Sequence, residues 1–203
     1  MKTGKDGAPA SRRRDHLVAT AGKLFYRDGY RAVGIDTLLA EADVAKMTLY
    51  NHFPSKDALI AAVIKKRSDE VLAGLAEAVE TAGRSPENRL LAVFDWLKIL
   101  FGNGDFNGCA FIRALSEFPE PSHVIHKAAW EHKQAVRSML VGLAAEAGAK
   151  DPAALADAMR LLIDGSLVAA HATGSAKPAT VARNAAAALL KSSRTRLIFL
   201  RAT

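Results

Sequence analysis

The sequence has little cysteine, few aromatic residues and no long apolar run. Cys109 is the single cysteine among 203 residues, so no disulfide can form within the chain and no paired-cysteine metal motif exists. This favours a reducing compartment, and we expect a cytoplasmic protein. Residues 1–14 are polar and charged, unlike a signal peptide, and no stretch approaches the roughly 18 consecutive apolar residues of a membrane span.

Sequence signatures of catalysis are absent as well. We find no Ser/His/Asp set, no glycine-rich phosphate loop and no paired-carboxylate motif, which argues against a small helical enzyme. His123 and His126 have the HxxH spacing used by some metal sites, but no carboxylate or cysteine completes a ligand set. We therefore expect no catalytic residues, no cofactor and no metal.

Positive charge is concentrated in the first third of the chain. Residues 1–67 contain 13 Lys and Arg against 7 Asp and Glu, whereas residues 68–203 contain 15 against 14. A separate basic segment on a nearly neutral body is typical of a protein that binds DNA. The overall charge of +7 alone would not separate nucleic acid from an anionic membrane surface.

The spacing of apolar residues predicts an all-α protein of about nine helices, with no convincing strand. In the first helix Leu17, Ala21, Leu24 and Phe25 fall on one face, and Gly29 supplies a stop. Ser55, Ser122 and Thr180 are good helix caps. The expected helices cover 11–28, 35–42, 45–52, 56–81, 86–101, 107–117, 123–147, 153–171 and 181–192.

These elements divide into three parts. Residues 1–10 look like a flexible basic arm, residues 11–56 form a small three-helix domain, and residues 57–203 form a larger helical domain. The tail Thr195–Thr203 extends the last helix, forms a strand-like end or is disordered, and the sequence does not choose among these.

Three short helices with a sharp turn between the second and third describe a helix-turn-helix. Periodicity alone leaves other small three-helix bundles open. The segments from Leu24 to Tyr30 (LFYRDGY) and from Ile35 to Leu59 (IDTLLAEADVAKMTLYNHFPSKDAL) closely resemble the DNA-binding domain of the TetR family. Over the larger domain the resemblance is only one of length and helical content.

The sequence departs from the common family pattern in three places. Asp43 stands where glycine is usual in the turn, and Asp tolerates the left-handed conformation better than most residues. Ala45 replaces a common serine, and Val33-Gly34 replaces a Thr/Ser pair, with Gly34 an acceptable N-cap. We expect the fold to survive these changes and some phosphate contacts to be lost.

The resemblance places DNA contacts on the third helix and the start of the fourth. An α-helix fits the major groove, where each base pair presents a distinct set of donors and acceptors. Lys46 can donate to guanine, Thr48 can contact a base, and Met47 packs on a thymine methyl or lies idle on the surface. Arg12 to Arg14 either enter a minor groove or are simply solvated. The expected DNA-binding residues are Lys46, Met47, Thr48, Tyr50, Asn51, His52 and Lys56.

The larger domain concentrates the big apolar side chains in its middle. The resemblance implies a pocket for a small-molecule effector there, although plain core packing explains most of these residues equally well. Asp164 and His171 lie two turns apart on one helix, and either they satisfy each other's hydrogen-bonding groups or they face a ligand. The expected pocket residues are Trp96, Phe111, Ile112, Trp130 and His171.

Small residues fill the last two helices, among them Gly165, Ala169, Ala182 and Ala186. The resemblance implies that these helices pair with their copies in a homodimer, although burial within one chain is the alternative. The predicted protein is a transcriptional repressor that releases a near-palindromic DNA operator when an effector binds, and that needs no membrane. The alternative is a helical DNA-binding or adaptor protein without an effector.

Overall fold

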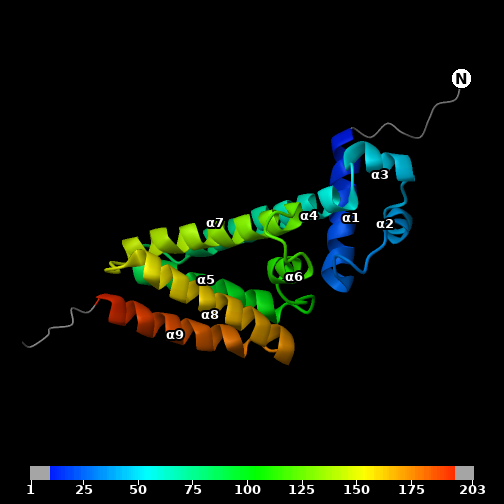
Figure 1. Ribbon diagram of the computed structural model, residues 1–203. Coiled ribbons are helices and arrows are strands. Elements are labelled where there is room, and N and C mark those ends of the chain that lie inside the picture. Colours follow the sequence, from blue (N-terminus) through cyan, green and yellow to red (C-terminus); the bar gives the residue numbers. More distant parts are fainter. Residues whose placement is uncertain (1–9, 195–203) are drawn as a thin grey trace, which may run out of the picture. The chain divides into compact units, whose positions relative to one another are not determined.

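The computed structural model describes residues 10–194, and within them every regular element is a helix (Figure 1). The all-α prediction is confirmed. The expected arm, apart from Ala10, and the tail Thr195–Thr203 lie outside the described residues. The helices are α1 (Ala10–Asp28), α2 (Ile35–Ala42), α3 (Lys46–His52), α4 (Lys56–Thr81), α5 (Pro86–Gly102), α6 (Ala110–Glu117), α7 (Val124–Glu146), α8 (Pro152–Thr173) and α9 (Lys177–Arg194).

The described chain forms two compact units, which we call the head and the body. The head contains residues up to 69 together with 110–132, and the body contains residues 70–109 together with those from 133 onward. The head therefore combines α1, α2, α3 and α6 with the first parts of α4 and α7. It includes the whole 11–56 segment and adds residues from the larger predicted domain.

The core of the head is built on the apolar stripe of α1. Leu17, Ala21, Leu24 and Phe25 are all buried, as their helical spacing predicts. Gly29 ends the helix at a φ of +95°, and its N–H donates to the carbonyl of Phe25. The stop signal predicted at this glycine is confirmed.

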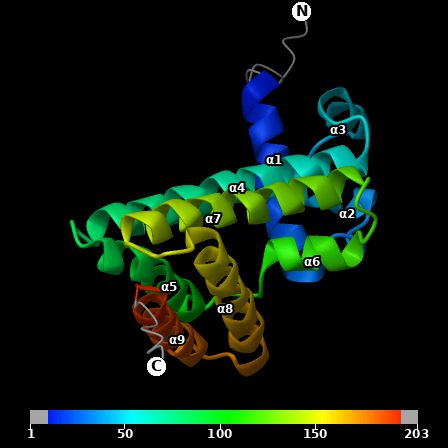
Figure 2. The same cartoon turned by 60° about the vertical axis from the view of Figure 1, so that its left-hand side comes forward.

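The body is organised around α5, α8 and α9. Figures 1 and 2 show α8 and α9 side by side, and α5 also packs against α9. Alanines allow these helices to approach closely, and Ala156, Ala179 and Ala186 are fully buried. At Gly74 the indole of Trp96 lies so close that an added Cβ would come within 2.8 Å of its Nε1.

Helices α6, α7 and α9 depart from the starts or caps expected of them. Helix α6 begins at Ala110 rather than Asn107, because Gly108 adopts a φ of +81° that no right-handed helix contains. Helix α7 begins after His123, whose Nδ1 accepts the N–H of Ile125, so Ser122 is not the cap. Helix α9 begins at Lys177, so the expected cap at Thr180 is wrong.

We expect Asp43→Gly to stabilise the protein by about 0.5–1 kcal/mol. Asp43 lies in the left-handed region, with φ 50° and ψ 51°, as the sequence predicted for this turn. Glycine adopts this conformation without the Cβ clash that costs an L-residue free energy. Urea denaturation measures the change. As a control, Asp36→Gly in the first turn of α2 should destabilise by about 1 kcal/mol, and stabilisation there would contradict the explanation.

Candidate DNA-binding interface

The turn between α2 and α3 is short and fixed by backbone hydrogen bonds. The N–H of Val44 donates to the carbonyl of Leu39, and the N–H of Asp43 donates to that of Ala40. Ala45 is the N-cap of α3 in an extended conformation and offers no side-chain hydrogen bond. The free N–H groups at this end of α3 are therefore available to an external acceptor.

Helix α3 has one face in the core and the other in solvent. Leu49 is fully buried, and Phe53, just after the helix, is 3% exposed. Met47 is 69% exposed and Tyr50 39% exposed, and Lys46 and Asn51 are exposed with them. Thr48 and His52 are half-buried at the margins. The structure thus places six of the seven expected DNA-binding residues along one short helix, five of them with donor groups.

The charge around α3 favours an anion. No acidic residue occurs from Val44 to Lys56, so the outward face of the helix carries donors and the Lys46 ammonium without a competing carboxylate. Arg14 lies over the Phe53 ring at 5.1 Å, which ties the first part of α1 to the residue that ends α3. Arg12 to Arg14 lie within α1, as the expected range 11–28 implies.

Lys56 is held more tightly than the sequence indicated. Its side chain is half-buried, and Nζ donates to the carbonyl of Arg31 at 3.2 Å. Burial lowers the pKa of Lys56, while Asp57 and Glu117 act in the opposite direction. One ammonium hydrogen is thus engaged within the head, which orients the others at the start of α4. The Ser55 hydroxyl caps this helix by accepting the N–H of Ala58, as predicted.

A set of contacts from α6 braces the turn between α1 and α2. The Glu117 carboxylate accepts the N–H of Tyr30 at 3.2 Å and that of Arg31 at 2.7 Å. The Arg31 guanidinium donates back to the Glu117 carbonyl and lies over the Phe118 ring. Arg113 adds a 2.8 Å hydrogen bond to the carbonyl of Tyr26. Sequence reasoning missed this α6 brace, because its partners are more than 80 residues apart and no local signal marks them.

The five expected effector residues fall in both units. In the head, Phe111 is buried and stacks on His132 with ring centroids 3.5 Å apart, Ile112 is half-buried, and Trp130 is 45% exposed. In the body, Trp96 packs over Gly74, and the exposed His171 lies against Gly108.

Among the residues that the structure describes, neither a metal site nor a membrane span is found. His126 bonds the Phe118 carbonyl, and His123 lies 3.4 Å from the Asp57 carboxylate. Within the described ranges no group of three His, Cys, Asp or Glu residues is placed to hold a metal ion. Among the helices from α1 to α9, none is both long and apolar enough to cross a membrane.

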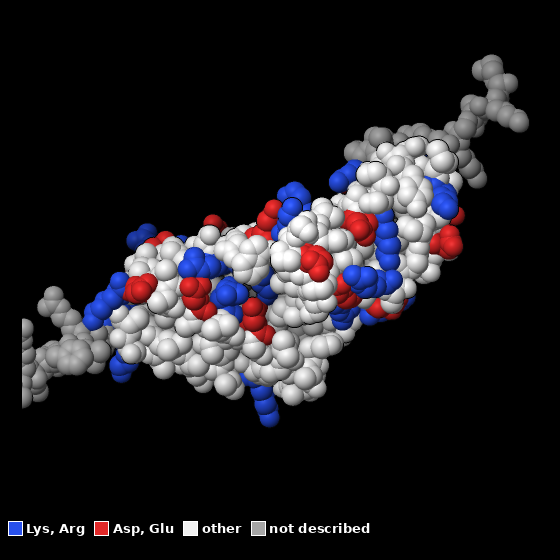
Figure 3. Space-filling view, viewed as in Figure 1, with Lys and Arg blue, Asp and Glu red and all other residues white. Residues whose placement is uncertain are grey.

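A second surface lies on the body, between α8 and α9. A mostly apolar hollow of about 630 Å³ is lined by residues of both helices, among them Leu161, Gly165, Ala169, Val181 and Ala185. Leu161 and Val181 are 67% and 68% exposed there. Figure 3 shows few charged side chains over these two helices. None of the five expected effector residues lines this hollow.

Comparison with known proteins gives consistent matches. The family model of bacterial regulatory proteins of the tetR family matches residues 17–63, which cover α2, α3 and the adjoining parts of α1 and α4. The transcriptional regulator YjdC of Escherichia coli is 25% identical over 76% of this chain and 81% of its own.

Solved structures extend the match to both units. A TetR regulator of Streptomyces avermitilis, SAV143, is 31% identical over 86% of this chain and 97% of its own, with a TM-score of 0.71. SCO4454, a TetR-family regulator of Streptomyces coelicolor, is 29% identical over 91% of this chain and 97% of its own, with a TM-score of 0.85.

Proposed function

Because the chain belongs to the TetR family of DNA-binding transcriptional regulators, we propose that it is a repressor that releases its operator when a small molecule binds its larger helical domain, residues 57–203. The operator is a near-palindrome with half-sites about 34–36 Å apart, one helical turn of DNA. Ligand coupling of this kind amounts to about 1–3 kcal/mol. The E. coli relative NemR, 28% identical over about half of each chain, is also a repressor.

The observation that carries the proposal is the two-sided α3. Leu49 is buried beneath the helix, while the outer face carries exposed donor side chains, and an α-helix fits the major groove. Lys46 donates to guanine O6 or N7, Thr48 contacts a base edge, and Met47 packs on a thymine methyl. Tyr50, Asn51, His52 and Lys56 bind phosphate oxygens and set the register on the duplex.

The proposed assembly is a homodimer formed through α8 and α9. A seven-residue recognition helix makes too few base contacts for useful specificity, so two copies are needed. A second copy is the occupant that fits the apolar hollow, since a two-fold contact buries the exposed Leu161 and Val181 of both copies in one interface.

Selection of bound fragments from genomic DNA tests this function. The selected fragments should share an inverted repeat and stay bound in about a thousandfold excess of random DNA. A reporter gene behind such a fragment should be silenced by the protein, whereas increased expression would reverse the proposed sign of regulation. Equal competition by random DNA would instead favour a non-specific binder without an operator.

We expect Lys56→Ala to weaken binding to every DNA sequence alike. If its ammonium neutralises one phosphate, the slope of log K against log salt should become shallower by about 0.9. Fluorescence anisotropy at several salt concentrations measures the slope. Lys98→Ala, on an exposed position of α5, provides the matched control and should leave it unchanged. An unaltered slope for Lys56→Ala would remove this residue from the interface.

A further inference from the structure

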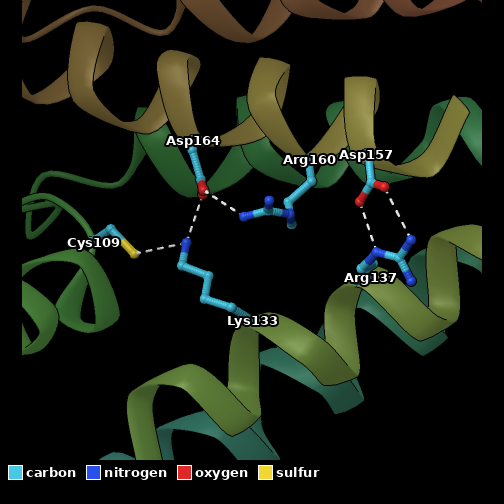
Figure 4. A network of polar contacts seen from close by, with 6 residues as sticks. All are labelled: Cys109, Lys133, Arg137, Asp157, Arg160 and Asp164. Atoms are coloured by element: carbon cyan, nitrogen blue, oxygen red, sulfur yellow. Dashed lines mark hydrogen bonds and ion pairs between the residues drawn. The ribbon is translucent and has the colours of Figure 1, made fainter. Parts of the chain in front are cut away.

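A polar network in the body contains more cations than anions. Lys133 on α7 reaches Asp164 on α8 with Nζ 2.5 Å from Oδ1, and it lies 3.9 Å from the Cys109 sulfur. Arg160 approaches the same carboxylate with a 3.8 Å contact to Oδ2. Arg137 makes a two-pronged ion pair with Asp157 at 2.6 and 2.9 Å (Figure 4). Three cations thus share two carboxylates, and one positive charge is left over.

Lys133 and Arg160, which share Asp164, are the more buried cations of this network. The Lys133 side chain is only 7% exposed, and those of Arg160 and Asp164 are 24% and 25% exposed. Charged groups at this depth are normally paired and hydrogen-bonded, because desolvation is expensive. Asp164 contacts both Lys133 and Arg160, so of the two alternatives for Asp164 and His171 the mutual pairing is wrong.

One donor of this network has no acceptor. Arg160 Nε is buried and finds no hydrogen-bond partner among the described residues. Arg183 Nε shares that property, but it lies 2.8 Å from the Asp95 carboxylate and is therefore paired in charge. Arg160 differs because the Asp164 carboxylate, which it shares with Lys133, contacts Nη1 and not Nε. An unpaired buried donor of this kind indicates a missing partner.

We propose that the missing partner is the carboxylate of a small organic effector, bound by Arg160 and Lys133. This rests on the proposed function and names its ligand class. A carboxylate accepts the Arg160 Nε hydrogen and neutralises the unpaired charge in one step. The acid carries an apolar body, since the network borders the hydrophobic core, against which Cys109 and Phe106 pack.

The binding test observes the Arg160 Nε–H group directly. Protein labelled with ¹⁵N-arginine is titrated with sodium benzoate and sodium octanoate, and separately with benzamide and octanamide at matched ionic strength. We expect at least one carboxylate to shift the Arg160 resonance saturably, while its amide and sodium chloride do not. If neither carboxylate moves the signal, or if chloride moves it equally, the inference is overturned.

Two variants separate recognition from structure. Arg160→Lys keeps the charge but loses the Nε donor, so carboxylate affinity should fall about tenfold, measured as a thermal shift. Arg89→Lys is the matched control, because that arginine is similarly buried and already paired with Glu146. Equal affinity in the two variants would overturn the role of Arg160. Circular dichroism verifies that both are folded.

The failures of the two proposals are distinguishable. The carboxylate that shifts Arg160 is added to the complex of the protein with its selected operator. If the Arg160 resonance shifts but the DNA stays bound, the carboxylate site is supported and ligand-controlled release is contradicted. If a neutral amide releases the DNA without shifting the Arg160 resonance, ligand-controlled release is supported and the proposal of a carboxylate effector is overturned.

Discussion

Replacing Leu49 by alanine is expected to cost about 3–5 kcal/mol of stability and to abolish operator binding. Helix α3 has seven residues, well below the roughly 12–15 that an isolated helix needs, so packing has to hold it in place. Leu49 is its one buried residue and is fully enclosed. Truncation leaves a cavity beneath the helix, and this costs stability because the surrounding core relaxes only partly into it. Urea denaturation and anisotropy with the selected operator measure the two losses.

Met47→Ala is the matched control on the same helix. Met47 is 69% exposed, so its loss should change stability by no more than about 0.5 kcal/mol. Any effect on DNA binding then comes from lost contacts and not from a displaced helix. A Leu49→Ala protein as stable as Met47→Ala would show that α3 does not depend on this anchor.

The helix-turn-helix was predictable because its signals are local. Gly29, Asp43 and Ser55 each mark a chain reversal or a helix start within a few residues, and all three behave as expected. The helical spacing of Leu49 and Phe53 predicts their burial, and both are buried. The cap predicted at Thr180 was wrong, because α9 begins at Lys177, whose N–H donates to the Ser175 hydroxyl.

The contacts that link distant segments were not predictable. Glu117 accepts the Arg31 N–H from 86 residues away, and Lys133 meets Asp164 across 31 residues. The sequence left open whether Asp164 pairs with His171, seven positions along the same helix, or faces a ligand. The fold instead brings two cations from α7 and α8 to Asp164 and leaves His171 against Gly108. Helical spacing shows which residues share one face of a helix, but it does not show which residues of other helices pack against that face.

Val181→Asp is expected to convert the proposed dimer into monomers and to lower operator affinity by about 10²–10⁴-fold. Val181 is 68% exposed at the edge of the apolar hollow between α8 and α9. An aspartate at this position of each copy would be desolvated in the two-fold contact without a partner. A monomer has one head, so it loses the additional operator affinity that two linked half-site contacts provide. Light scattering after size-exclusion chromatography measures the mass.

Val124→Asp separates assembly from a general effect of the new charge. Val124 is also exposed, at 50%, but it belongs to the head and lies at the start of α7, where a carboxylate suits the helix dipole. We expect this protein to remain dimeric and to bind the operator as before. If both variants stay dimeric, the α8–α9 face is not the interface. If both become monomeric, the exposed apolar hollow is not what determines assembly, because a charge placed outside it has the same effect.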